Sequence, residues 1–451
     1  IDPGRDAHMY SAYHGYWPTG ALAVEPRFGT LDDLQALQQG LAQRGLGLVV
    51  DLVWNHTGYD SPLLAEHPEW FHRAPSISNW DDPIEREEGQ VHGLPDLDQD
   101  IPAVYDYLLE SSRWWLEQSG ATGMRLDAVG HMPAGFVQRI QQDLGEKRWS
   151  VGEIFEGSAP KLAAAWRETG LPAVFDFPLH HAMVDVLCKN ASLGRLASVL
   201  SQDRFYEDAT GLVTFLDNHD TPRIASACEG DLAKVESAVR FVLATRGVPS
   251  ITWGTAVPLQ GAEEPDNRAD MKFEGNPALL GAIQEGLAMR ADQPVFARGR
   301  TQTVVLTEDQ LVLMRTLGRE HAFVAINRAE ATPLPMPESL APVRLPGTQV
   351  SAWLPMPPEG EAADWVAAWE GKREVRFVGV PEGWQVVGSA PELGGWDPHR
   401  ALEGIEASFP LGDVVSWKLV RVDGSGAVSW DGGENRTLWV KPGKGFLEVP
   451  L

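Results

Sequence analysis

The feature that most limits how this chain can fold is a repeated unit of an amphipathic helix, a short turn and a buried strand. Leucines recur at helical spacing over residues 31–44, Gly45 follows, and an apolar run then extends over 46–53. The same order returns several times downstream. Strands that alternate with helices predict a parallel sheet, because a parallel connection needs a crossover of helical length.

The repeats predict a barrel. Including the short apolar runs outside the clearest helix–strand pairs, we predict seven strands, which suits a (β/α)8 TIM barrel that lacks its first strand. The predicted helix–strand pairs after the first are 104–118 with 123–127, 134–144 with 149–153, and 232–245 with 248–253, and the additional strands are 21–24, 174–177 and 212–216.

The remaining segments divide the chain into domains. A polar stretch rich in Pro, Trp and His is longer than an ordinary loop and predicts an inserted subdomain B. Later, short alternating segments predict an antiparallel β domain C, then a Pro-rich linker and a β-sandwich. The predicted boundaries are 1–56 and 101–291 for the barrel, 57–100 for subdomain B, 292–355 for domain C, 356–371 for the linker and 372–451 for the β-sandwich.

Composition excludes several classes of partner. The chain has 37 Lys and Arg against 63 Asp and Glu, a net charge of −26. Such a surface repels phosphate backbones and anionic membranes, so we expect no nucleic acid and no membrane partner. The 17 Trp suit stacking on sugar rings, although most Trp in any fold belong to the core. No signal peptide is visible in this chain.

The two cysteines, Cys188 and Cys228, are too few for a disulfide framework and lack metal-ligand spacing. We expect two buried thiols or one pair.

Carboxylates at the ends of the predicted strands carry the chemistry. In parallel barrels the catalytic groups lie at the carboxyl ends of the strands, and Asp127, Glu153 and Asp220 occupy three separate strand ends. Crowded carboxylates split their pKa values, which gives one ionised nucleophile and one protonated acid. A retaining glycosidase needs that pair.

Several short motifs follow one another along the chain. They are 12–17 (AYHGYW), 51–56 (DLVWNH), 94–98 (LPDLD), 125–131 (RLDAVGH), 151–153 (VGE), 215–220 (FLDNHD) and 265–268 (PDNR). In this order they resemble the motifs of the alpha-amylase family, glycoside hydrolase family 13. The resemblance covers about 12–327 and implies a starch-degrading enzyme.

The resemblance implies roles for these residues. It makes Asp127 the nucleophile, Glu153 the general acid/base and Asp220 the group that stabilises the distorted transition state. Arg125 would keep the nucleophile ionised, because a guanidinium lowers the pKa of a nearby carboxylate. The residues expected to line the subsite on the non-reducing side of the cleaved bond are Tyr16, His56 and His219.

The resemblance also implies a structural Ca²⁺ between barrel and subdomain B, a hard cation that takes oxygen ligands. The matching positions are Asn55, Asp96 and the backbone carbonyl of His131.

Two departures from the family pattern stand out. Gly130 lies where many members carry a Lys that contacts the leaving sugar. The family also has a first strand before the segment at 12–17, and its absence would expose two sheet edges. We therefore expect the natural protein to be longer at its N-terminus, or another segment to fill the gap.

The C-terminal β unit resembles starch-binding domains of carbohydrate-binding module family 20. The matching segments are 386–389, 392–398, 417–418, 428–430 and 434–437. The resemblance implies that Trp396 and Trp430 stack on glucose rings while Lys418 and Asn435 add hydrogen bonds.

Three functions remain open from the sequence. The first is a retaining hydrolase of α-1,4-glucosidic bonds in starch and malto-oligosaccharides. The second is a glucan transferase or cyclising enzyme that uses the same acids, and the third is a non-catalytic glucan-binding protein. The complete set of three acids argues against the third. We expect a secreted protein, because starch granules do not cross membranes. We also expect a monomer.

Overall fold

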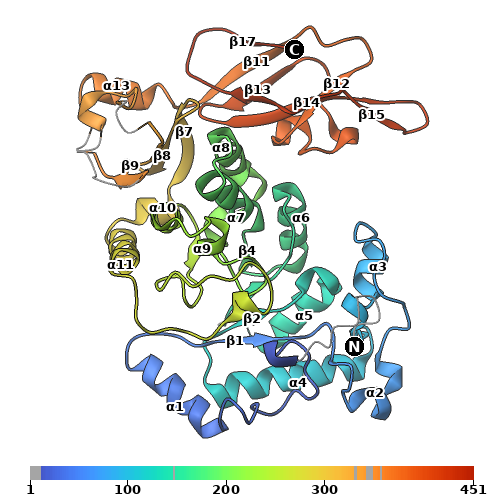
Figure 1. The fold of residues 1–451 in the computed structure, drawn as a ribbon. Coiled ribbons are helices and arrows are strands. Elements are labelled where there is room, and N and C mark those ends of the chain that lie inside the picture. Colours follow the sequence, from blue (N-terminus) through green and yellow to red (C-terminus); the bar gives the residue numbers. More distant parts are fainter. Residues whose placement is uncertain (1–11, 146–147, 330–332, 342–348, 356–357) are drawn as a thin grey trace. The chain divides into compact units, whose positions relative to one another are not determined.

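The computed structural model describes residues 12–145, 148–329, 333–341, 349–355 and 358–451. The chain divides into two compact units, residues 1–156 with 161–175, and residues 157–160 with 176–451. In the part of the chain described, no helix is both long and apolar enough to cross a bilayer. Each unit is described by itself below, with the elements labelled in Figure 1.

The first unit is built on four parallel strands, paired in the order β1-β2-β3-β4. All four residues of β2 are buried, as the apolar pattern predicted. The strands are β1 (Val49–Leu52), β2 (Gly123–Leu126), β3 (Trp149–Gly152) and β4 (Ala173–Phe175). The helices are α1 (Leu31–Ala42), α4 (Pro102–Ser119), α5 (Ala134–Leu144) and α6 (Ala159–Thr169), the last beginning in the short segment of the second unit.

Local signals set the ends of these helices. Thr30 caps α1 in a reciprocal capping box with Asp33. Pro102 opens α4, and Gly120 ends it in the left-handed conformation at φ 66°. One predicted strand is wrong: residues 21–23 form bends, and residue 24 has no regular structure. The apolar run is only four residues long and is followed at once by Glu25 and Pro26.

Subdomain B consists of short helices and connecting loops. The elements are α2 (Leu63–Glu66), α3 (Pro83–Glu88) and two 3₁₀ turns, Pro68–Trp70 and Val91–Gly93. Isolated β-bridges tie the segment back on itself, pairing Phe71 with Leu97 and His56 with Asp96. The second bridge anchors the subdomain to the end of the first strand.

The second unit contains two more parallel strands and a helical core. Strand β5 (Leu212–Phe215) pairs with β6 (Val248–Ser250). A disulfide joins Cys188 to Cys228, so the two cysteines are paired. The helices are α7 (Phe177–Met183), a π-helix (Val184–Cys188), α8 (Leu193–Ser201), α9 (Ile224–Ala227), α10 (Leu232–Ala244), α11 (Pro277–Asp292) and α12 (Pro294–Arg298).

The antiparallel β domain follows as predicted, with the strand order β10-β9-β8-β7. Its strands are β7 (Arg300–Leu306), β8 (Gln310–Leu317), β9 (Glu320–Asn327) and β10 (Val350–Trp353). The predicted linker at 356–371 instead contains a helix, α13 (Glu361–Ala367). Ala362, Val366 and Trp369 of this segment are buried, so apolar spacing outweighs the Pro-rich start.

The C-terminal unit is a β-sandwich. One sheet has the order β13-β11-β17, and the other has β12-β14-β15 with β16 also paired to β14. Trp417 and Phe377 pack in the same apolar cluster as Val312 and Phe323 of the β domain, so the two β parts share one core. The strands are β11 (Lys372–Val378), β12 (Gln385–Gly388), β13 (Glu406–Pro410), β14 (Val414–Val422), β15 (Val428–Trp430), β16 (Arg436–Trp439) and β17 (Leu447–Pro450).

The fold class predicted from the sequence is confirmed. The strands β1 to β6 are the parallel βα repeats of a partial TIM barrel, and antiparallel sheets follow in the order expected.

Candidate active site

Arg125 is the centre of a cluster of carboxylates in the first unit. Its Nη1 atom lies 2.6 Å from Oδ1 of Asp127 and 3.0 Å from Oδ1 of Asp51. Its Nη2 atom lies 2.9 Å from Oε1 of Glu153. The side chains of Arg125, Asp127 and Glu153 are only 9%, 11% and 13% exposed. One nearly buried guanidinium therefore holds three carboxylates together.

The parallel register explains why these residues meet. Asp51 on β1 lies beside Arg125 on β2, and Arg125 lies beside Val151 on β3. The pairing continues past the strand ends, because the Asp127 N–H donates to the Leu52 carbonyl at 3.0 Å. Residues with similar positions on neighbouring parallel strands leave the sheet at the same edge. The strand ends thus bring together groups that are far apart in sequence.

The cluster keeps Arg125 charged. Burial alone would lower the pKa of Arg125, but the carboxylates of Glu153, Asp51 and Asp127 raise it well above its usual value. A permanent cation between the acids offsets the repulsion that crowding would otherwise impose.

Two further predicted residues adjoin this cluster. The Tyr16 hydroxyl donates to Oδ2 of Asp51 at 2.7 Å, and the Tyr16 ring centre lies 5.3 Å from Cζ of Arg125. Burial, reinforced by the Asp51 carboxylate, raises the pKa of Tyr16, so its hydroxyl stays protonated. His56 Nε2 lies 3.0 Å from the Tyr16 carbonyl, and burial lowers the pKa of His56 to about 4. His56 is therefore a neutral ring whose Nε2 donates to that carbonyl.

Asp51 opens the matched segment 51–56, but no specific role for it was predicted from the sequence. The Asp51 carboxylate contacts both Arg125 and Tyr16. It therefore links the arginine that holds Asp127 to the tyrosine that is expected to stack on the sugar. The available signal was its place as a carboxylate at a strand end, the same criterion that selected Asp127.

The predicted calcium ligands are brought together in part. Asn55 Nδ2 donates to Oδ1 of Asp96 at 2.9 Å, and His72 Nδ1 lies 2.7 Å from Oδ2 of the same carboxylate. Oδ1 of Asn55 is buried with no hydrogen-bond partner among the described residues. His131 turns its ring Nδ1 to the Arg86 carbonyl at 3.1 Å, which leaves its backbone carbonyl as the candidate ligand.

An orphaned amide oxygen beside a buried carboxylate is the kind of donor set that a hard cation takes, so the residues present fit Ca²⁺. Among the described residues, no three His, Cys, Asp or Glu side chains gather as a metal site, so amide and backbone oxygens would complete the shell. Ca²⁺ bound there would supply structural cross-linking between Asn55 and Asp96.

Asp220 has a defined environment of its own in the second unit. Its Oδ1 lies 2.9 Å from Arg268 Nη2, and its Oδ2 lies 2.9 Å from His219 Nε2. The side chain is 33% exposed. Asn267 Nδ2 donates to the His219 carbonyl at 2.9 Å and fixes the same turn. Arg268 belongs to the matched segment 265–268, but no role for it was predicted.

The predicted sugar platform occupies one face of a sheet in the β-sandwich. Residues two apart on a strand share a face, as do cross-strand partners, so Lys418, Val420 and Trp430 point to the same side. Trp396 packs against the cluster that contains Val420. Trp430 is 44% exposed, and Asn435 is also exposed. Lys418 Nζ donates to the Gly433 carbonyl at 2.7 Å.

Two exposed aromatic residues were also missed. Phe155, two residues beyond Glu153, is 63% exposed, and Trp80 of subdomain B is 49% exposed. The Trp80 ring lies edge-on to the His131 ring, with centres 5.7 Å apart. A Cβ built on Gly130 would meet Ile154 at 3.7 Å, an ordinary contact, so a side chain fits there. Exposed aromatic rings such as those of Phe155 and Trp80 can stack on sugars.

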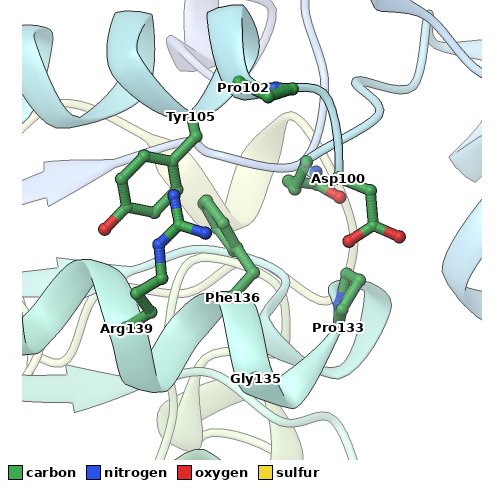
Figure 2. A pocket seen from close by; sticks show the side chains of 8 residues that line it. Asp100, Pro102, Tyr105, Pro133, Gly135, Phe136 and Arg139 are labelled. Carbon is green, nitrogen blue, oxygen red and sulfur yellow. The ribbon is translucent and has the colours of Figure 1, made fainter.

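A pocket of about 240 Å³ in the first unit involves none of the predicted site residues. Figure 2 shows Arg139 against Tyr105, and Cζ of Arg139 lies 3.5 Å from the Tyr105 ring centre. Arg139 therefore makes a cation–π contact that closes one wall of the pocket. The lining residues are Gln99, Asp100, Pro102, Tyr105, Pro133, Gly135, Phe136 and Arg139.

The fold and the clustered carboxylates define a class, a parallel βα enzyme scaffold with acids at the carboxyl ends of its strands. Residues 3–279 match the model of the alpha-amylase catalytic domain, and residues 377–446 match the starch-binding domain. The chain therefore belongs to the alpha-amylase family and carries a C-terminal domain of the starch-binding type.

Two curated relatives illustrate the similarity. The chain is 31% identical to a beta/alpha-amylase of Paenibacillus polymyxa over 335 residues, 70% of this chain and 28% of that protein. It is 30% identical to a cyclomaltodextrin glucanotransferase of Geobacillus stearothermophilus over 359 residues, 73% of this chain and 50% of that protein. The chain thus spans half or less of the length of these relatives.

A solved structure extends the similarity to most of the fold. The alpha-amylase of Geobacillus thermoleovorans, complexed with acarbose, is 26% identical with a TM-score of 0.67, covering 94% of this chain and 82% of that one.

Proposed function

We propose that the protein is a retaining glycoside hydrolase that cleaves α-1,4-glucosidic bonds in starch and related α-glucans. The observation that carries the proposal is the contact of one buried guanidinium, Arg125, with the two carboxylates Asp127 and Glu153 through its two terminal nitrogens. Carboxylates gathered on one planar group lie close together, as double displacement requires.

The reaction proceeds in two balanced steps. In the first, an Asp127 oxygen attacks the anomeric carbon while protonated Glu153 gives its proton to the glycosidic oxygen, so the C–O bond breaks and the leaving sugar departs as an alcohol. In the second, Glu153 takes a proton from water, whose oxygen attacks the anomeric carbon. The bond to Asp127 then breaks, and both carboxyl groups return to their starting states.

Several neighbours support these steps. Arg125 contacts both carboxyl groups, so it can balance the negative charge of whichever one is ionised at a given step. Protonated Tyr16 offers a stacking face for the bound sugar. Neutral His56 holds the Tyr16 backbone in place through its Nε2 hydrogen bond to the Tyr16 carbonyl. In the second unit we assign His219 and Asp220 to the sugar hydroxyls, with Arg268 fixing the Asp220 carboxylate.

A transferase is the second candidate, and a specific observation favours it. Phe155 lies two residues from the proposed acid/base and is 63% exposed. An exposed ring at that position offers an incoming sugar a stacking surface, which would let a sugar hydroxyl compete with water in the second step. The similarity to cyclomaltodextrin glucanotransferases also supports the transferase as a candidate.

We further propose that the C-terminal domain binds starch through Trp396 and Trp430, that Asn55 and Asp96 hold a structural Ca²⁺, and that the protein is secreted. The disulfide between Cys188 and Cys228 supports an oxidising location, because disulfides persist mainly outside the cytosol.

The test is to incubate the protein with soluble starch, beside an Asp127→Asn variant, and follow reducing ends and the product ladder. Reducing ends that rise only in the unmodified protein support hydrolysis. Redistributed or cyclised glucans with few new reducing ends would contradict hydrolysis and support the transferase. No change in glucan length at all contradicts both.

A further inference from the structure

We infer that Arg204, in the turn after α8, is a positioning residue for the sugar-stacking ring of Trp396. Glucan binding by the C-terminal domain then depends on the contact between that domain and the barrel part of the second unit. This inference rests on the proposed starch-binding role of Trp396. It adds that the binding platform is shaped by residues outside the starch-binding domain.

Arg204 makes a closed set of ion pairs with the starch-binding domain. Its Nη1 and Nη2 atoms donate to Oε1 and Oε2 of Glu392, both at 2.8 Å. Nη2 also lies 2.9 Å from Oδ2 of Asp413. Two parallel hydrogen bonds between guanidinium and carboxylate fix direction as well as distance. Arg204 therefore fixes the orientation of the segment that carries Glu392, four residues before Trp396.

The turn that carries Arg204 is held in place by other contacts. Arg204 belongs to a 3₁₀ turn, Gln202–Phe205, that directly follows α8. Its neighbour Asp203 accepts from the fully buried Arg246, with Nε 2.9 Å from Oδ1. Figure 1 shows α8 beside β14 of the starch-binding domain, and the two elements are in contact. The turn thus offers a fixed anchor for the loop that faces it.

At Gly395, the loop between Glu392 and Trp396 packs closely against side chains of the barrel part. A Cβ on Gly395 would lie 2.9 Å from Cζ of Phe205 and 3.0 Å from Cγ of Pro160. Gly395 is also in the left-handed region at φ 61°, and Trp396 follows at φ 69°. A large residue rarely adopts that conformation unless its surroundings impose it. The contacts with Phe205 and Pro160 supply one side of that constraint.

The other contacts that fix the backbone of Trp396 come from within the starch-binding domain. The Trp396 N–H donates to the Gly388 carbonyl at 2.8 Å, and the Trp396 ring packs against Val387 and Val420. Val420 is the cross-strand partner of Trp430. The loop is therefore held between the sheet that carries Trp430 and the turn that carries Arg204, and a shift of the loop would change the spacing of the two stacking rings.

The experiment is a double-mutant cycle in the full chain. Binding to raw starch granules and to β-cyclodextrin is measured for Arg204→Ala, Trp396→Ala and the double variant, all in an Asp127→Asn background. We expect Arg204→Ala to weaken binding about tenfold and to have no effect once Trp396 is Ala. Glu392→Gln, which keeps the shape of the loop, should weaken binding less, and Arg195→Ala on α8 is the matched control.

Kinetics separate positioning from general damage. With active protein on granular starch, Arg204→Ala should raise KM and leave kcat near its original value, whereas partial unfolding lowers kcat as well. Equal losses from Arg204→Ala with and without the Trp396 ring, or no loss at all, would overturn the inference. If Trp396→Ala and Trp430→Ala both leave binding intact, the proposed starch platform fails first and the positioning role fails with it.

Discussion

Arg125 Nη1 lies 2.6 Å from Asp127 Oδ1, while the other terminal nitrogen of Arg125 holds Glu153 at 2.9 Å. The same cation thus contacts the proposed nucleophile and the proposed acid/base. These two carboxyl groups must differ in protonation during the reaction, and a shared, permanently charged partner fixes their spacing while the proton moves.

Replacing Arg125 by Lys should lower kcat/KM by about a thousandfold, because a single ammonium cannot contact both carboxylates at once. Steady-state kinetics on a soluble malto-oligosaccharide would measure the loss. Arg113→Lys, at an exposed arginine of the first unit that donates to the Asp143 carbonyl, is the control. Full activity in the Arg125→Lys variant would contradict the prediction, because it would show that one positive charge without the double contact is enough for catalysis.

Gly130→Lys should lower KM for longer malto-oligosaccharides by roughly threefold, since an ammonium there adds a charge-assisted hydrogen bond to the leaving sugar. The position accepts a Cβ without a clash, so the fold should tolerate the change. Gly130→Met, of similar length without the charge, separates size from hydrogen bonding. A KM that rises in both variants would place this residue away from the leaving sugar.

Stability should depend on Asp413 as pH changes. Burial raises the pKa of Asp413 from 3.8 to about 7, with Glu392 adding to the rise and Arg204 and Arg300 opposing it. The folded state therefore retains a proton that the unfolded chain has released, so this contribution is complete below about pH 4 and is lost as pH rises toward 7. Asp413→Asn should flatten that part of the curve.

Urea unfolding at intervals from pH 4 to 8 would measure the Asp413 effect, with Asp81→Asn as the control because the Asp81 side chain is 91% exposed. If the free energy of unfolding of Asp413→Asn falls as steeply with pH as that of the parent protein, other groups cause the pH dependence.

Removing calcium should destabilise the protein. Chelation is expected to lower Tm by about 5 °C, and added Ca²⁺ should restore it, because a ligand that binds only the folded state stabilises that state. Asp96→Asn should abolish the response, since it removes the buried charge of the proposed site. A Tm that ignores both chelator and Ca²⁺ would mean that the contacts of Asn55, Asp96 and His72 hold this region without metal.

Much of the fold could be predicted because its information is local. Helical spacing of leucines and short buried runs indicated the βα units, and β2 and β3 lie within the predicted strands 123–127 and 149–153. The predicted strand at 21–24 failed because a run that short needs a partner strand to pair with it. The helix Glu361–Ala367 within the predicted linker could not be predicted, because Ala362 and Val366 find apolar neighbours that lie far away in sequence.

The sequence by itself determined which side chains end the strands, since the position of Asp127 relative to β2 and of Glu153 relative to β3 follows from short-range pattern alone. Only the tertiary structure decided that Asp51 joins Arg125, and that Arg204 reaches Glu392 across 188 residues. The physical reason is that periodicity records which residues are buried. The partner that each buried or charged group meets depends instead on the packing of elements distant along the chain.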